Sequence, residues 1–175
     1  LWLLLLLITL LPYALAVWQW QRGQDKEVLM RSLTSAMSTA PVGLVYREAE
    51  PPPAFTRVRL AQGEPAGPVI ELRNSYLGGQ SGRRILQPWR QGPDRSLVLL
   101  DLGWLVDGAK MPDFPPEQIQ PQGYRMPTPH HFVLSGAAKG TAGPVDEVDE
   151  AALRRRYPGH WFQGVVVLEN SPDPL

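Results

Sequence analysis

The sequence predicts a membrane-anchored, mainly β protein, in which an N-terminal transmembrane helix precedes a small antiparallel β-barrel or sandwich with one late helix. The first 18 residues carry no charge, and nine of the first 15 are Leu. From residue 55 onward, short apolar segments alternate with turns rich in Gly and Pro, which is typical of small all-β domains. Only residues 146–157 combine leading acids with trailing arginines, as a short helix does.

Composition excludes several functions. There are 17 Lys+Arg against 17 Asp+Glu, and no Cys. A balanced charge argues against nucleic-acid binding, because neutralising phosphates requires an excess of cations. Without Cys there is no disulfide, thiolate metal site or Cys nucleophile. The length of 175 residues suits one domain with an appendage.

The apolar N-terminal segment predicts a membrane anchor at residues 1–20. As a helix, Leu1–Trp18 would extend roughly 27 Å, close to the ~30 Å hydrocarbon core. Trp18 and Trp20 would then lie at the membrane interface, where Trp is enriched. The alternative is a signal peptide cleaved after Ala14-Leu15-Ala16. In both cases the rest of the chain is expected across the membrane, since the following flank has no cationic excess.

Residues 21–40 predict an amphipathic stalk helix. Apolar residues recur there at spacings of three and four, namely Val28, Leu29, Leu33, Ala36 and Met37. Gly23 destabilises a helix by about 1 kcal/mol relative to Ala, which permits a break at that residue. We expect the stripe to pack on the following domain, and the alternative is a helix that binds a partner.

Residues 41–175 predict an extracytoplasmic β-rich domain. The expected strands are residues 55–60, 69–76, 83–89, 96–106, 130–138 and 164–170, and residues 107–129, with six Pro, are expected to form a long loop. The segment Ser96–Val106 is almost continuously apolar. Such a run predicts a strand buried on both faces, or a central strand that crosses a sandwich. Gly103 within it is expected either to allow a close backbone approach or to form a bulge, with Trp104 filling the space beside it.

No local motif indicates catalysis. The sequence contains no nucleophile elbow, phosphate-binding loop or zinc-protease motif. His130 and His131 would point to opposite faces of a strand, so they could not easily bind one metal ion. We therefore predict no catalytic or metal-binding residue. A hydrolase or metal enzyme that uses these residues or His160 is a minor alternative. Arg154–Arg156 predict a solvated helix end, with anionic lipid headgroups as the other possible contact.

The segment Leu15–Lys26 resembles the end of the first membrane helix in the Surfeit-locus family of cytochrome c oxidase assembly proteins. That family typically shows L-G-x-W-Q-x-x-R-x-x-W-K at this place. Trp18, Gln19, Arg22 and Lys26 match the pattern in register. Ala16 replaces the usual Gly, and Asp25 the usual Trp.

Further blocks resemble the same family in the same order. They are Phe55–Leu60, Leu72-Arg73-Asn74, Gly82–Pro88 and Leu97–Trp104. The last is similar to the family's V-L-V-N-R-G-W strand. Gly103 and Trp104 match, whereas Leu102 stands where the family has Arg.

The resemblance implies an assembly factor of an energy-transducing membrane, either the bacterial cytoplasmic (inner) membrane with a periplasmic domain or the mitochondrial inner membrane. It would assist haem a insertion into the catalytic subunit of a haem-copper oxidase. The family's haem-linked His lies in a second membrane helix, which we do not find in this sequence, so no haem ligand is assigned. The alternative is a membrane-tethered accessory or interaction subunit of a respiratory complex. Candidate partner or membrane-interface residues are Trp18, Gln19, Arg22, Lys26, Gly103 and Trp104.

Overall fold

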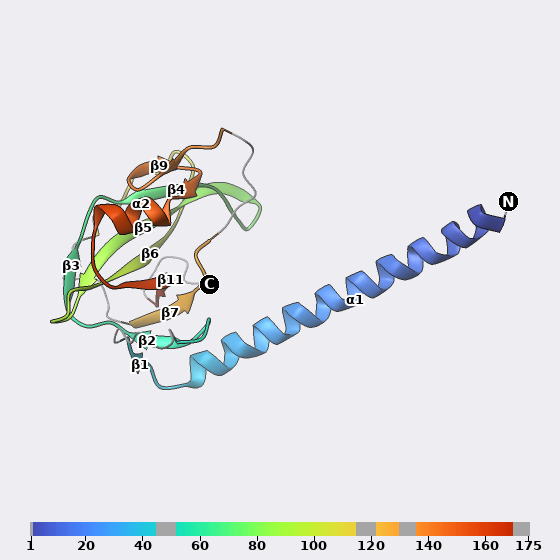
Figure 1. Cartoon of the computed structure of the whole chain (residues 1–175), viewed down its shortest axis with the longest axis horizontal. Helices are drawn as coiled ribbons and strands as arrows, with labels where there is room; N and C mark the ends of the chain where they lie inside the picture. Colours follow the sequence, from blue (N-terminus) through green and yellow to red (C-terminus); the bar gives the residue numbers. More distant parts are fainter. Residues whose placement is uncertain (1, 45–51, 115–121, 130–135, 170–175) are drawn as a thin grey trace. The chain divides into compact units, whose positions relative to one another are not determined.

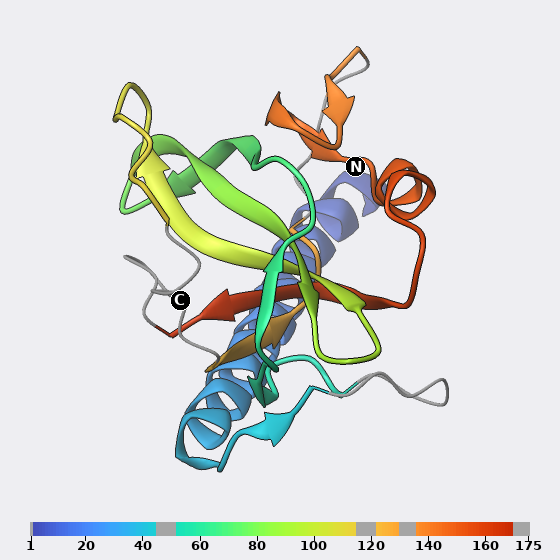
Figure 2. The same ribbon diagram turned by 90° about the vertical axis from the view of Figure 1, so that its left-hand side faces the viewer.

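The computed structural model of the protein describes residues 2–44, 52–114, 122–129 and 136–169 (Figures 1 and 2). The chain divides into two compact units, Leu1–Thr39 and Ala40–Leu175. The first unit is a helix and the second contains all the strands. We call the second the β unit.

The N-terminal unit is one helix, α1 (Trp2–Ser38), which continues through both Pro12 and Gly23. In the part of the chain that the structure describes, no helix is both long enough and apolar enough to span a membrane. The transmembrane helix predicted for residues 1–20 is therefore not confirmed. The side chains of residues 3–9 and 11 lie outside the described part, as do those of Leu29, Leu33, Ala36 and Met37 in the predicted stripe. Val28, the remaining residue of that stripe, is 62% exposed.

The β unit is built around a nine-stranded sheet in the order β1-β2-β7-β11-β6-β5-β4-β9, with β3 paired to β5. Its strands are β1 (Val42–Gly43), β2 (Arg57–Arg59), β3 (Gly63–Pro65), β4 (Ile70–Leu77), β5 (Gln80–Gln91), β6 (Ser96–Val106), β7 (Gln122–Met126), β9 (Gly143–Val145) and β11 (Trp161–Leu168). A second, two-stranded sheet pairs β8 (Lys139–Gly140) with β10 (Glu147–Val148), and α2 (Glu150–Arg156) precedes β11.

The prediction of a mainly β protein is confirmed, but the antiparallel arrangement is wrong in part. The sheet is mixed, because β1–β2, β4–β9 and β6–β11 are parallel pairs. Parallel neighbours require a long crossover between them. The connection from Val106 to Trp161, which includes α2, brings β11 back in the same direction as β6.

Strand β6 lies in the middle of the sheet and is buried on both faces, as its apolar sequence predicted. Its first eight residues are buried. Successive strand side chains point to opposite faces. Leu97 and Leu99 accordingly join one core cluster, with Val165 and Leu153, while Val98, Leu100 and Leu102 join a second one. The apolar residues from Leu97 to Leu102 therefore each contribute to one of the two cores.

Several predicted elements differ from the structure, since β5 extends beyond the predicted 83–89 and β11 begins at Trp161 rather than at 164. Strand β7 lies inside the segment predicted to be a loop. Helix α2 begins at Glu150 rather than 146, because Glu147–Val148 form β10 and Asp149 caps the helix by accepting the Ala152 amide at 2.8 Å. Residues 130–135 of the predicted strand 130–138 lie outside the described residues, and 136–138 are not in a strand.

A buried glutamine links two separate edges of the sheet. Gln91, at the end of β5, is 1% exposed. Its Oε1 accepts the Ala61 amide at 2.9 Å, and its Nε2 donates to the Leu44 carbonyl at 3.1 Å. Leu44 directly follows β1, and Ala61 lies between β2 and β3. The Gln91 side chain thus supplies the hydrogen-bond partners of the Ala61 amide and the Leu44 carbonyl, which are not paired between strands.

We predict that Gln91→Ala destabilises the protein by about 1–3 kcal/mol, since the buried Leu44 carbonyl loses its donor and an unsatisfied buried group costs about that much, whereas the Ala61 amide belongs to an exposed residue. Urea unfolding followed by circular dichroism measures this change. Gln80→Ala, at the exposed start of the same strand, is the matched control and should stay within about 0.5 kcal/mol of wild type. Equal midpoints for the two variants would contradict this role for Gln91.

Candidate functional site

Gly103 forms a bulge near the end of β6. Ile85 pairs with Gly103 and Leu86 with Asp101, so Leu102 is an extra residue on the bulged strand. Gly103 has φ 126°, a conformation that favours glycine. The predicted bulge is therefore present, and it re-aims the residues that follow it.

Asp101 stabilises this bulge from inside the sheet. Its side chain is 1% exposed. One carboxylate oxygen accepts the Gly103 amide at 3.0 Å, and the other accepts Arg84 Nη1 from β5 at 2.6 Å. A buried carboxylate requires such partners, because unpaired burial of a charge is costly. The Arg84 guanidinium and the Gly103 amide together hold the Asp101 carboxylate beside the bulge.

Trp104 packs across the neighbouring strand at a position without a side chain. Gly82 of β5 pairs with Val106 of β6, and a Cβ at Gly82 would collide with the Trp104 ring and the Leu105 carbonyl. The indole Nε1 lies 3.5 Å from the Ser75 carbonyl of β4. Val106, the next residue on the same face, is exposed. Trp104 is thus a partly exposed aromatic group held on a rigid backbone.

A second bulge lies on β4, beside these residues. The register shifts between Leu72 and Ser75, and Asn74 has φ 58°. Asp146 binds both residues of this bulge, since its Oδ1 lies 3.1 Å from Arg73 Nη2 and 3.1 Å from Asn74 Nδ2. Its Oδ2 accepts the Ala138 amide at 2.9 Å. Asp146 therefore connects the β4 bulge to the segment that precedes β8.

Three of the sequence blocks that resembled a known family thus meet on the adjacent strands β4, β5 and β6. We call Gly82, Arg84, Asp101, Gly103 and Trp104 the Trp104 cluster. The sequence analysis singled out Gly103 and Trp104 but missed Arg84 and Asp101. A lone acid within an apolar run was the available signal, because a buried Asp must have a partner.

Leu102 explains the departure from the family pattern at this bulge. Its side chain is buried in the core cluster that contains Ile85 and Leu100. An arginine at this position would either bury its charge in that apolar cluster or have to turn its side chain out of the cluster. In this chain, the guanidinium that meets the bulge comes from β5 instead, as Arg84.

The four candidate residues on α1 lie in the other unit. Trp18 is 49% exposed, and the Arg22 guanidinium lies over its ring, 5.4 Å from the centroid. This is a cation–π contact between residues one turn apart. Gln19 and Lys26 are exposed. Among the candidate residues, Trp18 and Arg22 are therefore in contact in the first unit, and Gly103 and Trp104 lie next to each other in the β unit.

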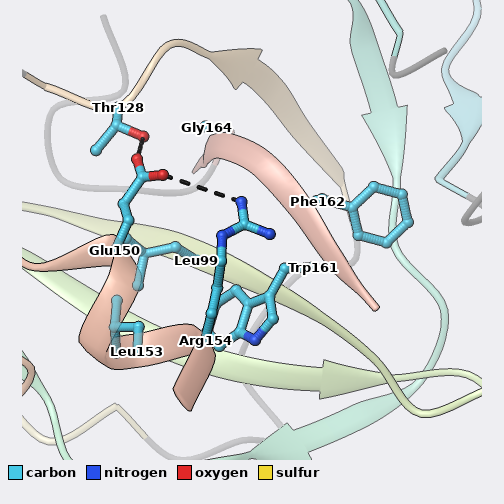
Figure 3. Close-up of a pocket in the computed structure, with 8 residues that line it drawn as sticks. All are labelled: Leu99, Thr128, Glu150, Leu153, Arg154, Trp161, Phe162 and Gly164. Atoms are coloured by element: carbon cyan, nitrogen blue, oxygen red, sulfur yellow. Dashed lines mark hydrogen bonds and ion pairs between the residues drawn. The ribbon is translucent and has the colours of Figure 1, made fainter. Parts of the chain in front are cut away.

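A small pocket lies between α2 and β11 (Figure 3). It encloses about 260 Å³, open solvent included, and its lining residues are Leu99, Thr128, Glu150, Leu153, Arg154, Trp161, Phe162 and Gly164. Glu150 accepts a hydrogen bond from the Thr128 hydroxyl, and its Oε2 lies 4.0 Å from Arg154 Nη2. Because that volume includes open solvent, the enclosed space is far smaller than the ~300–1,000 Å³ of most small-molecule sites.

The described residues show no group of metal-ligating side chains. Among them, no three His, Asp or Glu side chains are grouped to hold a metal ion. His160 is exposed, and the pocket beside α2 has no His or Met in its lining. His130 and His131 lie outside the described residues. We therefore assign neither a haem ligand nor a catalytic histidine.

A cluster of polar residues on β2, β7 and β11 was not predicted, because β7 was expected to be loop. Arg57 donates through Nε and Nη2 to the two carboxylate oxygens of Glu169, the second at 3.0 Å. This hydrogen bonding raises the pKa of Arg57. Burial raises the pKa of the neighbouring Tyr124, with a further contribution from the Glu169 carboxylate, while Arg57 opposes the shift.

We predict that Asp101→Ala destabilises the β unit by about 3–5 kcal/mol, because Arg84 loses its buried partner and the Gly103 amide its acceptor. Asp101→Asn should cost less, since the amide oxygen can still accept the Gly103 proton. Chemical unfolding measures both changes. Asp107→Asn, on the exposed turn after β6, is the control. A loss below about 1 kcal/mol for Asp101→Ala would show that the bulge forms without this carboxylate.

We predict that stability falls above about pH 10 because of Tyr124. Its pKa is higher in the folded chain than the ordinary value near 10, so the neutral phenol is favoured by folding. That stabilisation is complete below the unfolded pKa and is lost as the pH rises through the folded one. Urea midpoints between pH 8 and 11.5 should fall less steeply for Tyr124→Phe than for wild type. Tyr76→Phe, at a 73% exposed site, should behave as wild type, and identical slopes for all three would refute the prediction.

Comparison with known proteins identifies the family. A model described as the SURF1 family matches residues 5–173, which is nearly the whole chain. No curated protein and no solved structure matches this chain. The SURF1 family is associated with cytochrome c oxidase assembly and is not a known family of enzymes. On this match, and in agreement with the ordered sequence blocks, the chain belongs to the SURF1 family.

Proposed function

We propose that this protein is a membrane-tethered assembly factor of cytochrome c oxidase that assists haem a insertion into the catalytic subunit of this haem-copper enzyme. The observation that carries the proposal is the family match over residues 5–173. The β unit is compatible with a binding role, because no three His, Asp or Glu side chains are grouped to hold a metal ion among its described residues. It would act on the partner subunit by contact and not by chemistry of its own.

The exposed parts of the Trp104 cluster, Trp104 and Arg84, form the contact surface that we favour for this subunit, and the buried Gly82, Asp101 and Gly103 support them. Trp and Arg are enriched among the residues that dominate binding energy at protein interfaces. Trp104 is partly exposed and held rigidly over Gly82, and Arg84 beside it is about one-quarter exposed. A rigid aromatic group loses little conformational freedom on binding, which favours affinity.

The proposed tether is the first part of α1, with the β unit on the periplasmic side or its mitochondrial equivalent. Leu1–Trp18 is uncharged, and Trp18 and Trp20 are exposed aromatic residues of the kind enriched at membrane interfaces. Arg22, stacked on Trp18, and Lys26 one turn later could reach lipid phosphates from that interface. Gln19 could hydrogen-bond a neighbouring helix.

We predict that deleting the gene lowers the haem a signal in reduced-minus-oxidised spectra of membranes, and that the wild-type chain restores it. Trp104→Ala should restore it poorly at equal protein level in the membrane, whereas Tyr76→Ala, which removes another exposed aromatic residue, should restore it fully. An unchanged spectrum after deletion would contradict the proposed function.

The second candidate is a permanent accessory subunit of a respiratory complex, which the Leu102 departure favours. Purification of the mature oxidase distinguishes the two. A permanent subunit copurifies in a stoichiometric amount, while an assembly factor does not.

A further inference from the structure

The C-terminal end of α2 carries three consecutive exposed arginines, Arg154, Arg155 and Arg156. Residues four apart on a helix are neighbours on its surface. Arg154 has Glu150 at that spacing, 4.0 Å away. The corresponding residues for Arg155 and Arg156 are Ala151 and Ala152. The helix therefore compensates one of its three positive charges.

The other contacts of this surface leave its charge in place. The Arg156 guanidinium lies over the Tyr157 ring, 5.7 Å from the centroid, and its Nη1 donates to the Thr141 hydroxyl at 3.4 Å. Both partners are neutral. In the part of the chain that the structure describes, no carboxylate forms an ion pair with Arg155 or Arg156.

The arrangement forms a broad basic surface and not a pocket for one ion. Successive helical residues are about 100° apart around the axis, so the three side chains leave the helix in different directions and do not form a pocket around one ion. Long arginine side chains at a helix end can still extend toward several anionic groups of a headgroup layer. The attraction must be local, because the whole chain has 17 Lys+Arg and 17 Asp+Glu.

We propose that this basic end of α2, Arg154–Arg156, docks the β unit on anionic phospholipid headgroups. The inference rests on the proposed tether, because a covalent link to α1 keeps the headgroups at a high effective concentration. Near an anionic leaflet, each basic residue is expected to favour the docked state about fivefold at low salt. Docking would restrict the orientations in which the Trp104 cluster meets its partner.

The test uses the full chain, which has no Cys, so Ala151→Cys provides one exposed labelling site on α2. A fluorophore at this site should be quenched by vesicles with an acceptor on their headgroups, more strongly when phosphatidylglycerol replaces part of the phosphatidylcholine. Arg155→Gln with Arg156→Gln should lower the docked-to-undocked ratio about 30-fold. Arg59→Gln with Arg95→Gln, two exposed arginines on β2 and the β5–β6 turn, should leave it unchanged.

Flotation of the same samples separates this inference from the tether. A chain that floats with both vesicles but shows equal quenching in both has a tether and no basic docking, which overturns the inference alone. A chain that floats only with anionic vesicles, in an Arg155- and Arg156-dependent manner, supports docking and argues against the tether. Flotation with neither overturns both. Raising the salt from 0.1 to 1 M shortens the Debye length from about 10 to about 3 Å, so the extra quenching caused by phosphatidylglycerol should disappear, and its survival would also overturn the inference.

Discussion

The burial of strand β6 on both faces is the constraint on which the β unit depends. Leu97 and Leu99 face one core, and Val98, Leu100 and Leu102 face the other. The strand is paired with β5 along nearly its whole length and with β11 on its other side. A change in its register by one residue would exchange the two sets of side chains. The positions of α2, of β11 and of the surface at the end of β6 therefore follow from this strand.

The bulge at Gly103 turns the end of this core strand into a surface. Up to Leu102 the side chains of β6 are buried, and from Trp104 onward they are partly or fully exposed. The Asp101 carboxylate connects the buried part of β6 to its exposed end, since it is buried in the sheet and accepts hydrogen bonds from both the Gly103 amide and Arg84. A protein that works by contact needs this kind of rigidity, because pre-organised groups lose little entropy on binding. Membership of the SURF1 family and this geometry together support a binding role in oxidase assembly.

The sequence allowed several of these features to be predicted, and the reasons for the others are physical. The bounds of β6 were exact, because an apolar run between two turns leaves little choice, and the Gly103 bulge followed from a glycine in a buried strand. Strand β7 was missed because Gln122–Met126 has no apolar alternation. The parallel pairing of β11, the Gln91 link and the Arg84–Asp101 pair join residues distant in sequence, and no local pattern encodes such contacts. The transmembrane helix was predicted from the length and apolar composition of the segment and from its two following Trp residues, and it is not confirmed by the structure.

Site-specific photo-crosslinking in cells tests the central claim most directly. A photoreactive amino acid at Val106, which is 41% exposed beside Trp104, should crosslink to the catalytic oxidase subunit while the enzyme is being assembled. The same group at exposed Arg95, on the turn that joins β5 to β6, should not. Crosslinks from both sites or from neither, with the oxidase being synthesised normally, would contradict a specific contact between the Trp104 cluster and that subunit.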